Sequence, residues 1–318
     1  MSTDALTSAP SSSRDAPGVA LIGVPFSSTG RPGGIAAAID ALRAVGVRDR
    51  LAAFAGVRDR GDLIPVEPTA RRGPSGLLDE HSLAVLVHRT QHAVAAARGE
   101  GLRPLLVGGD CPVMLGALSA LRLERARVGL VMADGHEDAW PPFASPTGEA
   151  SDSELGIALG RVSDLPPALE SVHGVLDPST VALLGPRDRH ELQVHGIASL
   201  ASTLSTFTDA AHVPEHPGGL VRDAVERLQA PVWWLHIDLD VLRGEDFPAA
   251  DYQQPGGLTW SKLTELAMTA WREPGCAGAS VAIYNPDLDP DRSTARRLID
   301  FLRDLVAEPA EDTGGGRA

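Results

Sequence analysis

Apolar runs and amphipathic stretches alternate along most of the chain. Runs of strand length cover residues 19–24, 104–107, 128–133, 181–184, 231–237 and 279–284. Apolar residues recur at helical spacing over 35–44, 83–98, 112–121, 220–228, 262–271 and 294–305, and another helix is expected to begin at Glu154. Loops are expected over 61–75 and 140–153. Such alternation builds βαβ units, so the pattern predicts a mainly parallel sheet with helices on both faces.

The size and composition fit one large domain. The chain has 318 residues, of which 43% are hydrophobic, enough for an extensive core. We expect a single domain over 18–307, a disordered Ser/Ala/Pro-rich leader over 1–17 and a flexible tail over 308–318. The two cysteines, Cys111 and Cys276, predict no disulfide framework and fit a reducing cytoplasm.

The charge of the chain limits the kinds of molecule that it is expected to bind. The formal net charge is −14, and no basic stripe or polybasic segment is visible. This argues against a nucleic-acid or membrane surface and favours a small-molecule substrate. No apolar run approaches ~18 residues, so no transmembrane helix is expected.

Three short motifs carry the candidate chemistry. They are Gly108-Gly109-Asp110-Cys111, Asp134-Gly135-His136-Glu137-Asp138 and Asp238-Leu239-Asp240. Each follows an apolar run that predicts a buried parallel strand, and ligands bind beyond the carboxyl ends of such strands. The three motifs should therefore converge on one site.

Metal is the simplest explanation for so many acidic groups in one cleft. Like charges a few ångströms apart repel strongly in a low dielectric, and divalent cations neutralise them. In extended backbone, side chains at i, i+2 and i+4 share a face, which would align the ligands of each motif. Asp134 and Asp238 are candidates to bridge two ions, with Mn²⁺ favoured by the carboxylates. Two such ions would acidify a shared water into a nucleophile. The alternative is that these residues are surface-turn aspartates.

The sequence resembles the arginase/agmatinase (ureohydrolase) family. The resemblance rests on residues 22–26, Gly33-Gly34, the three motifs, Gly185-x-Arg187 and Asn285-Pro286. It implies a three-layer α/β/α fold around an eight-stranded, mainly parallel sheet, two Mn²⁺ ions, and a homotrimer or homohexamer. It also implies that Cys111, Asp134, Asp138 and Asp238 hold one ion, and that Asp134, His136, Asp238 and Asp240 hold the other. Asp138 would orient the bridging hydroxide and relay its proton to the leaving amine.

Two departures from the family affect the metal and the substrate. Cys111 stands where the family has a histidine, and its softer thiolate would shift preference from Mn towards Zn or Fe. A helix beginning after Cys111 would lower the pKa of this thiol. An inert thiol is the alternative. Ile283 replaces the glutamate that pairs with a guanidinium in the family, so another acid takes that role or the substrate is not a guanidinium.

Two further departures from the family affect residues that could bind substrate or move protons. Ser151 replaces the family's proton-shuttling histidine, and Asp152 and Glu154 follow it as candidate substrate ligands. Glu149 in the same loop could also receive a cation. Ser151, Asp152 and Glu154 also fit a helix-capping pattern, with Ser153 as another possible cap. His236 precedes Asp238 by two residues and shares its face, so it is a candidate proton shuttle; a core histidine is the alternative.

Two hypotheses follow. The first is a metal-dependent cytoplasmic hydrolase that cleaves a C–N bond of a guanidino or related amidine or amide compound, with Asp138 and His236 as catalytic residues. The second is an arginase-like binding or regulatory protein without catalysis, which the changes at Cys111, Ser151 and Ile283 motivate. His88 and His92 have the spacing of a helical metal-ligand pair, but they lie off the apolar stripe with no third ligand nearby, so a solvated helix face is the better interpretation.

Overall fold

The computed structural model describes residues 17–53 and 56–307. The expected tail, and the expected leader apart from Pro17, lie outside the described residues. The strands are β1 (Val19–Gly23), β2 (Val57–Asp62), β3 (Arg103–Val107), β4 (Gly129–Ala133), β5 (Val181–Leu184), β6 (Thr206–Thr208), β7 (Trp233–Asp238) and β8 (Cys276–Ala282). The α-helices are α1 (Ala38–Ala44), α2 (Val47–Ala52), α3 (Glu80–Gly99), α4 (Val113–Glu124), α5 (Glu154–Ala158), α6 (Arg189–Val194), α7 (Gly218–Arg227), α8 (Trp260–Arg272) and α9 (Ser293–Val306).

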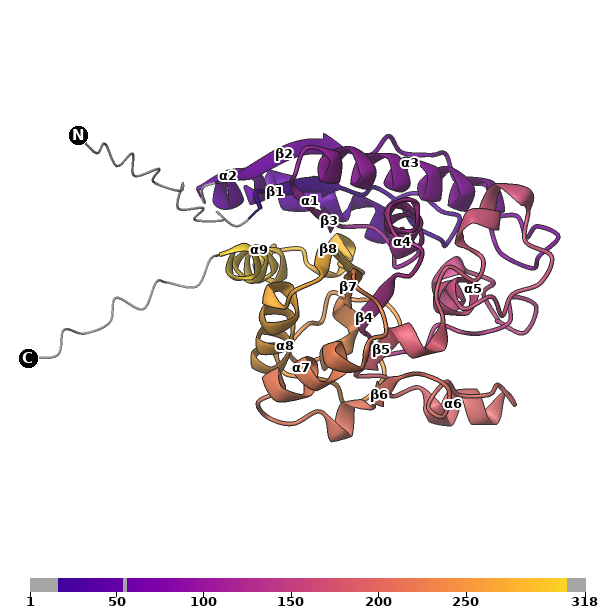
Figure 1. The fold of residues 1–318 in the computed structure, drawn as a ribbon. Helices are drawn as coiled ribbons and strands as arrows, with labels where there is room; N and C mark the ends of the chain where they lie inside the picture. Colours follow the sequence, from indigo (N-terminus) through magenta and orange to yellow (C-terminus); the bar gives the residue numbers. More distant parts are fainter. Residues whose placement is uncertain (1–16, 54–55, 308–318) are drawn as a thin grey trace, which may run out of the picture.

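The strands form one eight-stranded sheet in the order β2-β1-β3-β8-β7-β4-β5-β6. Every neighbouring pair is parallel. Parallel pairing requires crossover connections, and helices on both faces provide them (Figure 1). The expectation of a three-layer α/β/α fold with a mainly parallel sheet is confirmed, and the sheet is wholly parallel.

Two hydrophobic cores lie on opposite faces of the sheet. One contains α1, α2, α7, α8 and α9 together with inward residues such as Leu105, Leu235 and Val281. The other contains α3, α4 and α5 with the alternate residues Leu106 and Trp234. Adjacent strand residues therefore serve different cores, as strands buried on both faces require.

Two strands escaped the sequence pattern, and both are edges of the sheet. In β2, residues 57–62 alternate between half-buried and exposed, and the segment VRDRGD is mostly polar. Its last two residues fall in the segment 61–75 that was expected to be a loop. The other edge, β6, has only three residues. Edge strands are often short or charged because this discourages pairing with other chains, so the apolar signal is weak there.

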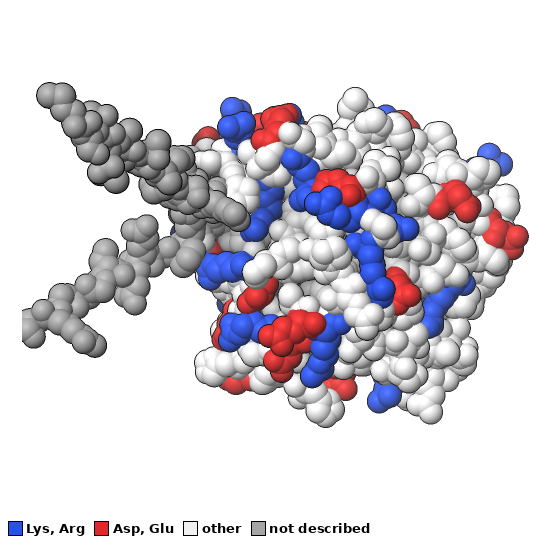
Figure 2. Space-filling model, viewed as in Figure 1, with Lys and Arg blue, Asp and Glu red and all other residues white. Residues whose placement is uncertain are grey.

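The sheet order brings the three motifs together. The adjacent strands β3, β8, β7 and β4 form its centre, and three of them lead directly into the motifs at their carboxyl ends. The remaining one, β8, leads into Ile283. The face seen in Figure 2 mixes basic and acidic side chains, with no broad area of one sign among the described residues. None of the helices in the described segments is long and apolar enough to cross a membrane.

Candidate metal centre

The second and third motifs form turns that are closed by their own aspartates. The backbone N–H of His136 donates to Asp134 Oδ1 at 2.8 Å, and that of Asp240 donates to Asp238 Oδ1 at 2.6 Å. Each is an i to i+2 bond of the kind that aspartate makes in Asx-turns. The expectation of extended backbone was therefore wrong beyond the strand ends. The side chains converge because the chain turns there.

The first motif needs glycine to approach the sheet closely. Gly109 has φ +69°, and a Cβ there would lie 2.6 Å from the carbonyl oxygen of Val24. Its own carbonyl accepts the N–H of Ile283 at 2.9 Å, which ties this turn to the end of β8. Cys111 follows in a buried position, and its Sγ donates to Asp238 Oδ2 at 2.9 Å. The turn thus fixes the thiol beside the third motif.

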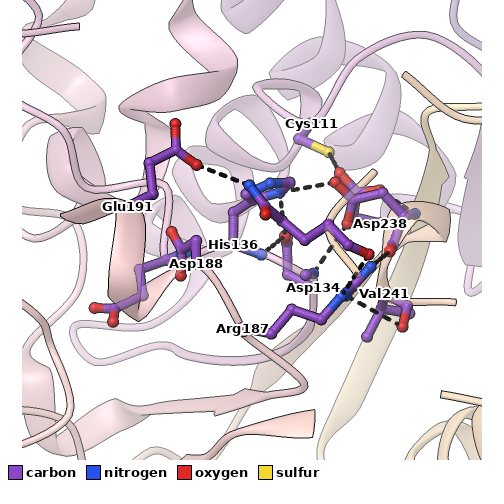
Figure 3. Close-up of polar contacts among 12 residues, drawn as sticks. Cys111, Asp134, His136, Arg187, Asp188, Glu191, Asp238 and Val241 are labelled. Atoms are coloured by element: carbon purple, nitrogen blue, oxygen red, sulfur yellow. Dashed lines mark hydrogen bonds and ion pairs between the residues drawn. The ribbon is translucent and has the colours of Figure 1, made fainter. Parts of the chain in front are cut away.

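The motifs contribute to three overlapping groups of possible metal ligands. In each group, one donor atom per residue lies within 4.8 Å of the others. The groups are Asp134 with His136 and Asp240, Asp134 with Cys111 and His236, and Asp134 with Asp138 and Glu154. His136 Nδ1 contacts Asp240 Oδ2 at 2.8 Å. Figure 3 shows Cys111 and His136 facing the Asp134 and Asp238 carboxylates. Asp134 is thus the shared member.

Electrostatics make this arrangement costly without a cation. Burial and mutual repulsion raise the pKa of Asp134, Asp138 and Asp238 well above the ordinary aspartate value. Burial alone would lower the pKa of His136, but the Asp240 carboxylate outweighs it and raises that pKa to about 9. The same imidazole helps to hold the pKa of Asp240 below its usual value despite burial. The charges in the cluster are only partly balanced.

The thiol of Cys111 does not have the lowered pKa that its place before a helix predicts. Burial raises its pKa well above the ordinary value, and the Asp238 and Asp134 carboxylates raise it further. The helix N-terminus is outweighed because these charges are closer and the site is dry. A bound cation would reverse the balance, since a coordinating thiol is deprotonated outright.

Unpartnered buried atoms show that the residues fit a cation. Several buried side-chain atoms of the cluster have no hydrogen-bond partner in the described part of the chain: Asp134 Oδ2, both carboxylate oxygens of Glu154, and His236 Nε2. Glu154 and His236 have no exposed surface. Buried polar groups are normally hydrogen-bonded, so such a cluster needs an explanation. Oxygen, nitrogen and sulfur donors at one point suit a divalent metal.

A cavity of about 340 Å³ opens above the cluster. Its lining includes Asp138, His136, Asp238 and Asp240 from the cluster, and Asp110, Glu149, Ser151, Asp152, Glu191, Asp251, Tyr252 and Ile283 around them. Of the expected substrate ligands, Ser151 and Asp152 therefore border the cavity. Glu154 and His236 do not; both lie below it among the metal-ligand groups. Burial lowers the pKa of His236 to about 3, so its ring is neutral.

Helix capping does not explain the 151–154 segment. Ser153 occupies the N-cap position of α5, but no side chain caps the helix. Its hydroxyl donates to the carbonyl of Trp140 at 2.7 Å. Asp152 Oδ2 accepts from Thr147 Oγ1 at 2.6 Å and from Ser145 Oγ. Ser151 Oγ lies 3.0 Å from Ser28 Oγ. The side chains of Ser151, Asp152 and Ser153 are therefore directed to neighbouring segments, whereas Glu154 lies among the metal-ligand groups.

Supporting contacts emerge that the sequence did not reveal. Arg187 donates to the carbonyl oxygens of Asp240, Val241, Leu242 and Gln254, which ties down the turn after β7 (Figure 3). The Tyr252 hydroxyl donates to Glu149 at 3.2 Å. Burial and the nearby Asp110 and Asp152 carboxylates raise the pKa of Glu149 to about 7. The Gly185-x-Arg187 pattern was a sequence signal for Arg187, and Glu149 was expected as a possible cation partner, but the contact of Glu149 with Tyr252 had no such signal.

Comparison with known proteins agrees with the fold. A model described as the Arginase family matches residues 17–307. Arginase from Bacillus caldovelox is 26% identical over 303 residues, covering 91% of this chain and 98% of that protein. Its solved structure superposes with a TM-score of 0.77 at 24% identity, covering 92% of this chain and 99% of that one. Agmatine ureohydrolase of Thermoplasma volcanium gives 0.67 at 18% identity, with 91% and 89% covered. The family match spans nearly the whole described chain, and the chain therefore belongs to the arginase family.

Proposed function

We propose that the protein is a metal-dependent hydrolase that cleaves a C–N bond in a cationic guanidino or related amidine compound. The observation that carries the proposal is the convergence of Asp134, His136, Asp238 and Asp240 beneath an acidic cavity. Arginase and agmatine ureohydrolase, to which this chain is similar, are named for such substrates. An amide substrate is the related alternative. The oligomeric state implied by the family stays a prediction.

The residues would divide between two ions. His136 and Asp240 would hold one ion, and Cys111 and Asp138 would hold the other, with Asp134 and Asp238 serving both. Manganese suits the carboxylate-rich side, and the thiolate favours zinc or iron on the other. When bound, the ions would supply an activated water and stabilise charge that develops at the carbon under attack. Asp138 borders the cavity and is buried, so its carboxyl is placed to carry a proton to the departing amine.

The cavity selects a positively charged substrate. Among the described residues that line it, none is lysine or arginine, whereas acidic residues line several sides. Glu149 is the candidate replacement for the family's glutamate that Ile283 displaces, because it borders the cavity and makes only one side-chain hydrogen bond, from Tyr252. Charge-assisted hydrogen bonds contribute about 1.5–3 kcal/mol, so a guanidinium held by Glu149 would bind roughly ten- to a hundredfold more tightly.

The test is hydrolysis of a panel of guanidino, amidine and amide compounds by the manganese- or zinc-loaded protein. The reaction is monitored by measuring the urea and ammonia released. Asp138→Asn should lower kcat by roughly 10²–10⁴-fold, the usual contribution of a positioned acid or base. Glu149→Gln should raise KM with little change in kcat, and Glu67→Gln, at an exposed position, is the matched control. If the panel gives no turnover while two ions bind, the catalytic proposal fails. The binding-protein hypothesis would then take its place.

A further inference from the structure

His236 is the buried group that the proposed hydrolysis does not use. It lies in β7, two residues before Asp238, and none of its surface is exposed. Its Nδ1 is 2.7 Å from Ser280 Oγ on the neighbouring strand β8, directly across the register pair. Its Nε2 has no hydrogen-bond partner among residues 17–53 and 56–307. A core histidine that served packing alone would leave this nitrogen buried and unsatisfied.

Ser280 and Trp234 fix the orientation of the ring. The indole N–H of Trp234 donates to Ser280 Oγ at 2.9 Å. A serine oxygen has two acceptor lone pairs, so it can accept from Nδ1–H as well. In that tautomer the lone pair of the ring stands on Nε2. Ligating histidines use the same arrangement, with the other ring N–H held by a hydrogen-bond acceptor.

The free nitrogen belongs to the group that contains Cys111. A ring nitrogen of His236, Cys111 Sγ and a carboxylate oxygen of Asp134 lie within 4.8 Å of one another. Nδ1 is engaged by Ser280, so Nε2 is the nitrogen available to this group. Asp134 also has a buried, unpartnered oxygen, Oδ2, and Asp238 Oδ2 lies 2.9 Å from the thiol. Three of the four side chains therefore come from adjacent strands or their ends, and the fourth from the turn after β3.

We propose that His236 is a ligand of the metal ion bound by Cys111. The imidazole that the family carries in the turn after β3 would be supplied here from β7, while a thiolate occupies the original position. Sulfur, imidazole nitrogen and carboxylate oxygen are all donors that zinc accepts. This ion would be zinc, and the His136 side would keep the harder manganese-type environment. The inference rests on the metal centre of the proposed function but not on its hydrolytic step.

The test compares ligand variants in the zinc-loaded full-length protein. His236→Asn keeps an amide near the Nδ1 position for Ser280 but cannot reach the Nε2 position. Losing the hydrogen-bond partner of a metal ligand lowers metal affinity by roughly 10–100-fold. Losing the ligand itself should cost more, so titration of His236→Asn should show the zinc affinity of one of the two sites lowered by more than that. Zinc X-ray absorption should show imidazole scattering at about 2.0–2.1 Å reduced to the part that His136 contributes, with sulfur at about 2.3 Å kept. Cys111→Ser should lose the sulfur, and exposed His88→Asn should change neither.

Each outcome decides the matter. Two unperturbed zinc sites and an unchanged imidazole signal in His236→Asn would overturn the proposal and leave a core histidine. If His236→Asn does not fold, Ser280→Ala retains the ring and should weaken the same site by roughly 10–100-fold; an unchanged affinity would overturn the proposal. A wild-type protein that binds no zinc or manganese would overturn the metal centre as a whole. A zinc site with His236 bound, in a protein that hydrolyses nothing, would support this inference while the proposed function fails.

Discussion

Replacing Gly109 with alanine should both destabilise the protein and displace Cys111. A left-handed φ costs an alanine about 1–2 kcal/mol relative to the right-handed region. The new Cβ would also lie 2.6 Å from the backbone oxygen of Val24, which cannot rotate away. Relieving such overpacking costs typically about 1–3 kcal/mol, so the two effects together predict about 2–5 kcal/mol. The turn would have to move, and Cys111 would move with it.

Gly61→Ala provides the matched control. Gly61 has φ +78°, but a Cβ there would meet nothing within 4 Å, so only the backbone penalty of about 1–2 kcal/mol applies. Urea unfolding of the metal-free proteins gives both free energies, and zinc titration reports the Cys111 site. The expected result is a larger loss for Gly109→Ala, together with weakened zinc binding that Gly61→Ala does not show. Equal losses with unchanged zinc binding would refute the close-approach argument.

Three other perturbations test separate parts of the site. The free energy of unfolding of the metal-free protein should fall as pH rises from 5 to 8. Folding raises the carboxyl pKa of Asp110 to about 6 and of Glu149 to about 7, so the folded state binds these protons more tightly than the unfolded state does. Urea unfolding at several pH values measures this, and a free energy of unfolding that rises with pH would refute it. Arg187→Ala should weaken metal binding by roughly 10–100-fold while exposed Arg189→Ala does not, measured by zinc and manganese titration. Ile283→Glu should lower KM for guanidino compounds about tenfold, because the new carboxylate can make a charge-assisted hydrogen bond to the guanidinium. Ile283→Gln should not lower it, and equal effects of the two variants would exclude an ionic contact.

The centre of the fold could be predicted from the sequence because its strands are buried on both faces. Runs such as 128–133 and 231–237 are continuous and apolar, and they lie in the middle of the observed sheet. The edges could not, since β2 reads VRDRGD and β6 has three residues. Apolar periodicity in the sequence indicates burial, and the residues of these two edge strands are less buried than those of the central strands.

The site was predictable to the level of its motifs and no further. Strand-end aspartates meet because parallel strands share a carboxyl edge, which needs no knowledge of the loops. The Asx-turn bonds at Asp134 and Asp238 depend on the local path of the chain. The contact of His236 with Ser280 depends on the register between β7 and β8, and these residues are 44 apart in sequence. No spacing rule relates two such positions before the pairing is known.

Three of the four departures from the family lie close together, and this bears on whether they mark lost function. Cys111 follows β3, Ile283 follows β8 and His236 lies near the end of β7, and these three strands are adjacent. The Gly109 carbonyl accepts the N–H of Ile283, and Ser280 on β8 contacts His236. Random loss of function would leave a buried imidazole and thiol without a purpose, at a cost in stability. A set of linked replacements around one ion keeps an imidazole nitrogen at the centre and adds a thiolate beside it, so we interpret them as a changed metal site.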